Sequence, residues 1–101
     1  MMLPMEVEFA NRRLQERFER YLEAARAWGE PVARKYVQRV RDVQAASSVA
    51  ELQALRSLRL HPLKGGRAGE WNIDLHGRWR MIVKFEGQEV RIEEVSNHYD
   101  D

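Results

Sequence analysis

Two stretches of alternating apolar and polar side chains, 71–75 and 79–85, flank Gly77 and constrain the fold more than any other feature. The apolar positions are Trp71, Ile73, Leu75, Trp79, Met81, Val83 and Phe85. Side chains along a strand point alternately to the two faces of a sheet, so the pattern predicts an antiparallel hairpin with one buried face and a tight turn at Gly77. Further strands are predicted over 57–60, ending before Pro62, and over 89–95.

The chain before residue 57 is predicted to be mainly helical. Residues 5–9 alternate like a short strand, and apolar side chains from Asn11 onward then recur with helical spacing, which predicts one helix over 11–28. Asn11 is the predicted N-cap of this helix, Gly29 ends it, and Pro31 begins a second one. The capping box at 48–51 opens a short third helix through about 55. Helices followed by antiparallel strands predict an α+β fold, with an N-terminal helical hairpin on one face of a small, mainly antiparallel twisted sheet.

The composition narrows the kinds of site that the chain can form. A length of 101 residues predicts one domain over 1–101. Cysteine is absent, which excludes disulfides and thiolate metal sites, and the three histidines are far apart in the sequence, so no metal and no cofactor are expected. The sequence shows neither a signal peptide nor an apolar run long enough to span a membrane, so we expect a cytoplasmic protein.

Charge is segregated along the second half of the chain. Six basic residues and only two acidic ones lie within 57–85, whereas acidic residues dominate from 86 onward. The alternation is expected to place three of the bases on the open face of the hairpin, namely Arg78, Arg80 and Lys84. Lys64 and Arg67 lie in the glycine-containing loop before the hairpin, and His98 and Tyr99 follow the last strand. Arginine, lysine, histidine and aromatic side chains together are typical of an RNA site.

Each of these features also has a purely structural interpretation. The GGxxG loop at 65–69 lacks the strand before it and the helix after it that nucleotide-binding fingerprints require, so P-loop and Rossmann sites are rejected. Trp71 and Trp79 are assigned to the core and His76 to the turn. A run of charges is most commonly a solvated surface.

Four segments in order nevertheless resemble the HigB branch of the RelE/ParE superfamily of bacterial toxins. They are Leu58-Arg-Leu-His-Pro-Leu-Lys-Gly, Arg67-Ala-Gly-Glu-Trp-Asn-Ile, Gly77-Arg-Trp-Arg-Met-Ile-Val-Lys-Phe and Glu94-Val-Ser-Asn-His-Tyr. The resemblance implies a compact toxin that cleaves mRNA in the ribosomal A site. It also implies neutralisation by a HigA-like helix-turn-helix antitoxin, through which alone the protein would be associated with DNA.

The resemblance also implies roles for individual residues. The family's loop lysine, strand arginine and C-terminal histidine fall on Lys64, Arg80 and His98, which are the candidate catalytic residues. The candidate RNA-binding and positioning residues are His61, Arg67, Arg78, Lys84 and Tyr99. The sequence departs from the branch where Arg78 replaces a common asparagine, and where Ser96-Asn97-His98 replaces a common Asp-Tyr-His. Two other functions stay open: a ParE-like inhibitor of DNA gyrase, and an RNA-binding module without catalysis.

Overall fold

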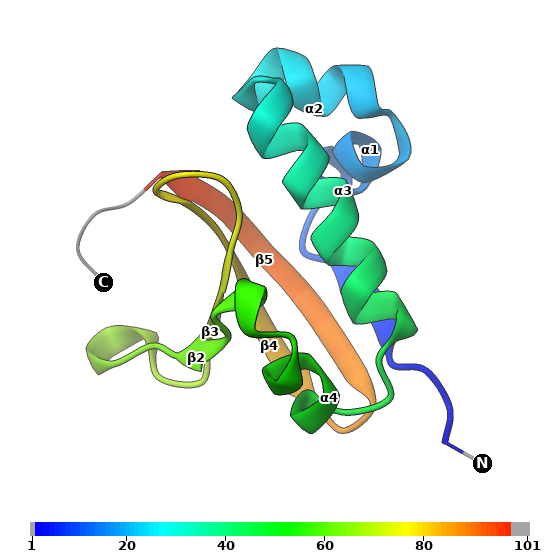
Figure 1. Cartoon of the computed structure of the whole chain (residues 1–101), viewed down its shortest axis with the longest axis vertical. Coiled ribbons are helices and arrows are strands. Elements are labelled where there is room, and N and C mark those ends of the chain that lie inside the picture. The colour runs from blue at the N-terminus through cyan, green and yellow to red at the C-terminus, as the bar shows by residue number, and fades with distance from the viewer. Residues whose placement is uncertain (1, 98–101) are drawn as a thin grey trace.

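The computed structural model describes residues 2–97 as a layer of helices against a five-stranded sheet (Figure 1). The α-helices are α1 (Arg12–Glu19), α2 (Tyr21–Trp28), α3 (Glu30–Ala45) and α4 (Val49–Ala54), and the 3₁₀ turns are η1 (Arg56–Leu58) and η2 (Gly65–Arg67). The strands are β1 (Glu6–Phe9), β2 (His61–Pro62), β3 (Trp71–Asp74), β4 (Trp79–Glu86) and β5 (Glu89–Asn97). No helix in this described part of the chain is long and apolar enough to cross a membrane.

The sheet confirms the predicted fold class. The strand order is β1-β5-β4-β3-β2, in which β1 pairs with β5 in parallel and all other neighbours are antiparallel. The alternating apolar side chains of β3 and β4 pack on the helices, and Ile73, Met81 and Val83 are fully buried. Trp71 and Trp79 pack against the same core but are only half-buried, so their assignment to the core is confirmed in part.

The predicted helix over 11–28 is two helices, because Arg20 has an extended backbone. Asn11 caps α1 as predicted, with its side chain accepting a hydrogen bond from the Leu14 N–H at 2.9 Å. Phe18 of α1 stacks on Phe9 of β1, whereas α2 packs mainly along α3. The break at Arg20 lets the two short helices meet these different neighbours, which one straight helix of this length would not do.

The predicted strand over 57–60 is wrong. Residues 56–58 form η1, and Arg59 adopts a left-handed conformation with φ 49°. Leu58 is buried in the core and the Ser57 carbonyl accepts a hydrogen bond from Arg39 of α3, so tertiary contacts favour a turn where the local sequence favours a strand. The extended segment begins later, at β2, which lies at the sheet edge as expected for a strand that contains Pro62.

Tyr36 makes the helix layer sensitive to high pH. Its buried hydroxyl donates a hydrogen bond to the Leu14 carbonyl at 2.7 Å, and burial raises the pKa of Tyr36 well above its ordinary value of 10, although Arg17 opposes the shift. The unfolded chain therefore releases this proton at a lower pH than the folded chain. We expect the free energy of unfolding to be insensitive to Tyr36 ionisation below pH 10 and to fall by up to about 1.4 kcal/mol per pH unit above it. Urea titrations across this range should show this decline in wild type and a weaker one in Tyr36→Phe.

Candidate functional site

The candidate site lies on the sheet face that turns away from the helices. Strand β4 places Arg80 and Ile82 there, because Trp79, Met81 and Val83 face the core. Arg80 is in register with Asp74 on β3 and with Ser96 on β5. The neighbours of Ile82 in the register are Asn72 and Glu94. The face is therefore built from the three central strands.

This face is covered at its centre, which corrects the expectation of an open basic surface. Arg80 is only 5% exposed and Ile82 is fully buried, whereas Arg78 and Lys84 are exposed as predicted. The loop between β2 and β3 covers part of this face. Its Arg67 reaches Glu94 on β5, so the loop has to cross β3 and β4 near Ile82. Arg80 itself is almost inaccessible to water.

A β-bulge in β5 supplies the carboxylates of this face. The register shifts between Ile82 and Val83, and both Ile92 and Val95 pack toward the helices, so the two residues between them, Glu93 and Glu94, turn toward the opposite face. Glu93 Oε2 lies 2.9 Å from Arg91 Nε, and its Oε1 lies 3.9 Å from Lys84 Nζ. A β5 strand with uninterrupted alternation would have placed only one of the two glutamates on this face. Nothing in the sequence indicates the bulge.

Arg67 ties the covering loop to the sheet. Its Nε donates to Glu70 Oε1 at 2.6 Å, and its Nη2 donates to Glu94 Oε1. The hydrogen bonds with Glu70 and then with Glu94 raise the pKa of Arg67 above its ordinary value. The Leu63 N–H also donates to the Glu70 carbonyl at 2.8 Å, which closes the loop on itself. Arg67 therefore holds the loop across the sheet near Ile82 and keeps its full charge.

We expect Glu94→Gln to loosen the covering loop. The substitution weakens one of the two carboxylate contacts of Arg67, and partly exposed pairs of this kind contribute about 0.2–1 kcal/mol. Hydrogen exchange of the Leu63 and Glu70 amides should become roughly twofold faster. Glu89→Gln is the matched control, because Glu89 is exposed on the same strand, whereas the carboxylates that bind Arg67 are those of Glu70 and Glu94. Equal exchange rates in both variants would show that Glu94 does not hold the loop.

The remaining predicted residues come from different elements of the structure. Lys64 is exposed at the start of η2, and His61 is exposed on β2 with its Nδ1 2.7 Å from the Arg59 carbonyl oxygen. Lys84 lies toward the other end of β4. His98 and Tyr99 lie outside the described residues. Of the three candidate catalytic residues, the structure thus describes Lys64 and Arg80.

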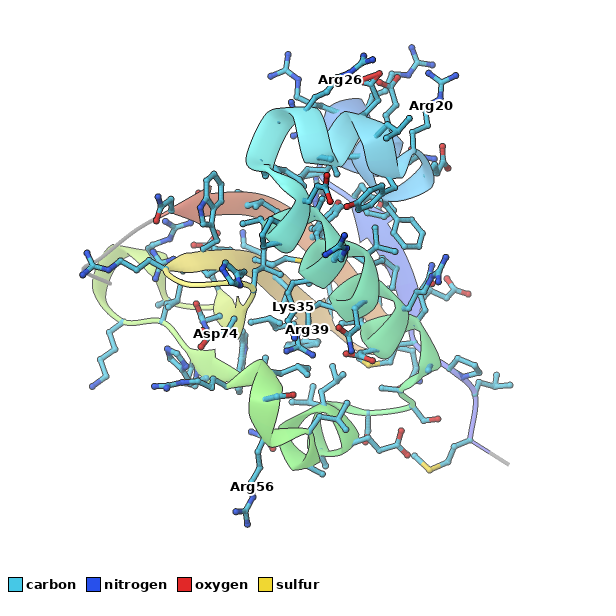
Figure 2. All side chains as sticks on the ribbon, turned by 45° about the horizontal axis from the view of Figure 1, so that its top comes forward. Arg20, Arg26, Lys35, Arg39, Arg56 and Asp74 are labelled. Atoms are coloured by element: carbon cyan, nitrogen blue, oxygen red, sulfur yellow. The ribbon has the colours of Figure 1, made fainter. Side chains whose placement is uncertain are left out.

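Arg39 and Asp74, which the sequence analysis did not single out as site residues, support this end of the sheet. Arg39 of α3, which Figure 2 labels together with Asp74, is 4% exposed. Its Nε donates a hydrogen bond to the Asp74 carbonyl at 3.2 Å. The Asp74 carboxylate lies 3.3 Å from Arg59 Nε and accepts a hydrogen bond from Asn72 Nδ2 at 2.8 Å. Arg39 thus connects the helix layer to the strand that neighbours Arg80. An arginine on the apolar stripe of α3 was the available signal.

No group of three or more histidine, aspartate or glutamate side chains within residues 2–97 is arranged to hold a metal ion.

Comparison with known proteins finds no matching family model, but it does find a curated relative. The endoribonuclease HigB from Proteus vulgaris is 36% identical over 47 residues, which make up 46% of this chain and 50% of HigB. The chain therefore matches about half the length of this relative.

Three solved structures share the fold at low sequence identity. The YoeB/ParE toxin from Agrobacterium tumefaciens has a TM-score of 0.57 and 19% identity, over 94% of this chain and 100% of that one. YoeB from Staphylococcus aureus, solved as a dimer, has a TM-score of 0.59 and 10% identity, over 94% and 98% of the two chains. YafQ from E. coli has a TM-score of 0.55 and 16% identity, over 92% of each. The chain therefore has the fold of these toxins, and its sequence resembles that of HigB over 47 residues.

Proposed function

We propose that this protein is the toxin of a type II toxin–antitoxin pair and an endoribonuclease that cleaves mRNA in the ribosomal A site. The observation that carries the proposal is the buried Arg80 on the sheet face opposite the helices, in a chain that also has an exposed loop lysine, Lys64, and resembles an endoribonuclease. Arg80 is in register with Ser96, and His98 follows only two residues later in the sequence. Two cations and a histidine are the groups that phosphodiester cleavage requires.

The proposed reaction uses the RNA's own nucleophile. A 2′-hydroxyl attacks the adjacent phosphorus, forming the 2′-oxygen–phosphorus bond as the bond from phosphorus to the 5′-oxygen breaks. A base takes the proton of the 2′-hydroxyl and an acid protonates the leaving 5′-oxygen, so the products are a 2′,3′-cyclic phosphate and a 5′-hydroxyl end. Arg80 and Lys64 stabilise the negative charge on the pentacoordinate phosphate, and His98 transfers a proton as acid or base.

The burial of Arg80 suits this role. A fixed cation in a site that excludes water stabilises developing charge more strongly than a mobile surface cation does. Arg67, held by two carboxylates, positions the loop that carries Lys64. The other proposed contacts with the RNA backbone and bases are made by His61, Arg78, Lys84 and Tyr99.

The proposed protein partner is a HigA-like helix-turn-helix antitoxin. An antitoxin has to keep RNA away from Arg80 and Lys64 to neutralise the activity described above. The exposed surface of the helical layer, α1 to α3, and the sheet face that carries Arg80 both offer surfaces for such contacts (Figure 1).

The direct test is to map the 5′ ends of a defined mRNA after adding the purified protein, with and without translating ribosomes. We expect new 5′-hydroxyl ends at A-site codons that appear only with ribosomes. Equal rates of cleavage with and without ribosomes would overturn the ribosome dependence but would still support the endoribonuclease activity. Intact mRNA under both conditions would overturn the nuclease, and loss of supercoiling activity by purified gyrase would then favour the ParE-like alternative.

A further inference from the structure

A cleft apart from the candidate site lies at the end of the sheet, between the α2–α3 junction and the β3–β4 turn. It has a volume of about 430 Å³, within the range of about 300–1,000 Å³ typical of small-ligand sites. Its aromatic walls are Trp28 of α2 and Trp79 of β4. Both tryptophans pack against the hydrophobic core on one side and are only half-buried, so part of each ring is left to line this cleft.

Trp28 is a fixed platform within this cleft. Its ring meets Tyr36 edge to face with 4.9 Å between centroids, and the Arg17 guanidinium lies 5.0 Å from its centroid. These contacts hold the indole in place while part of its surface stays exposed. A preorganised aromatic surface binds a planar ring with little loss of conformational entropy.

The same cleft is also lined by polar groups that can contact a base or its phosphate. Arg78 and His76 come from the exposed turn, where Gly77 has a positive φ of 61° and open space around the position of a side chain. Asn97 lines the cleft at the end of β5, where it is in register with Trp79. Amide and guanidinium groups beside aromatic surfaces are the groups with which proteins bind unstacked RNA bases.

The cleft and Arg80 lie at the same end of the sheet, on its two opposite faces. Trp79 and Arg80 are neighbours on β4, and Arg78 lies one residue before them in the turn. Asn97 directly precedes His98 in the sequence. An RNA strand with a phosphate at Arg80 can therefore place a base in this cleft by turning over this end of the sheet, past Arg78.

We infer that this cleft binds one unstacked base of the single-stranded RNA substrate, stacked on Trp28 and Trp79, beyond the nucleotides that react. The inference rests on the proposed function for its ligand, an RNA strand. Stacking accepts any base, since every base has a π-face, so the cleft supplies affinity and register without strict sequence preference.

The three tryptophans allow a test with a control inside the same molecule. The indole N–H signals of Trp28, Trp79 and Trp71 are followed by NMR while adenosine 5′-monophosphate is added, and ribose 5-phosphate is the matched ligand without a base. We expect saturable shifts of Trp28 and Trp79 with the nucleotide only, and no shift of Trp71, which does not line the cleft. Unmoved signals, equal shifts of all three, or equal shifts with ribose 5-phosphate would overturn the inference.

Variants then measure the contribution to RNA binding. Trp28→Leu should weaken binding of a short single-stranded RNA, blocked by 2′-O-methylation against cleavage, by about fivefold or more. Trp71→Leu is the matched control, since Trp71 is also half-buried and also meets an aromatic ring edge to face, that of Phe85 at 5.7 Å. Equal losses in both variants would indicate general destabilisation and contradict a specific base contact.

The binding and cleavage measurements separate this inference from the proposed function. Cleavage of mRNA by wild type without indole shifts overturns the base-binding cleft alone. Nucleotide-specific indole shifts without any cleavage support the cleft and overturn the nuclease.

Discussion

We expect Arg80→Ala to lower the proposed mRNA cleavage by about a hundredfold or more. Removing one group that stabilises the charge of a transition state typically costs about 2.7–4 kcal/mol, and Arg80 is the cation that the fold buries at the centre of the candidate site. The measurement is the rate at which 5′-hydroxyl ends appear on a defined mRNA in the translating extract. Growth arrest on expression should be lost in parallel.

Two further variants make this prediction decisive. Arg20→Ala removes the same side chain from the exposed junction of α1 and α2, where Figure 2 shows it pointing away from the molecule, and should cleave at the wild-type rate. Arg80→Lys keeps the charge but loses the planar fork of donors, so an intermediate rate is expected. Thermal unfolding of each variant checks that the protein is folded. A folded Arg80→Ala protein with the wild-type rate would refute the role of Arg80.

We expect Arg39→Ala to destabilise the protein by roughly 3 kcal/mol. Arg39 Nη2 donates to the Ser57 carbonyl at 3.3 Å and its Nη1 to Asp42 at 3.3 Å, in addition to its bond to the Asp74 carbonyl. Truncation removes these bonds from a buried charged donor, and a hydrogen bond to a charged group contributes about 1.5–3 kcal/mol. Urea-induced unfolding should show the midpoint moving to a lower concentration with an unchanged slope.

Lys35→Ala is the matched control for this prediction. Lys35 lies one helical turn before Arg39 on the same helix and is half-exposed, so its truncation should change stability by less than about 0.5 kcal/mol. Because Asp74 neighbours Arg80 across β3 and β4, Arg39→Ala should also slow cleavage under conditions where the variant is still folded. A variant that keeps wild-type stability would show that the three hydrogen bonds of Arg39 contribute little.

The helix layer and the hairpin could be predicted from the sequence because local rules govern both. Asn11 caps its helix, Gly77 turns the hairpin, and the alternation over 79–85 marks the strand face that packs on the helices. These are contacts between residues close in the sequence, or they follow from a periodicity that one strand shows by itself. The helix break at Arg20 and the turn at 56–58 depend on neighbours distant in the sequence, and there the prediction was wrong.

The candidate site divides in the same way. The sequence indicates which residue types are available: a loop lysine, a strand arginine on the face opposite the core, and a histidine after the last strand. The burial of Arg80 and Ile82 on that face, and the loop that Arg67, Glu70 and Glu94 hold across the sheet, follow from contacts between distant segments of the chain. A sheet fixes the face on which a side chain lies, whereas its exposure depends on what other segments place over that face, and a bulge in β5 supplies the Glu94 carboxylate that holds the loop.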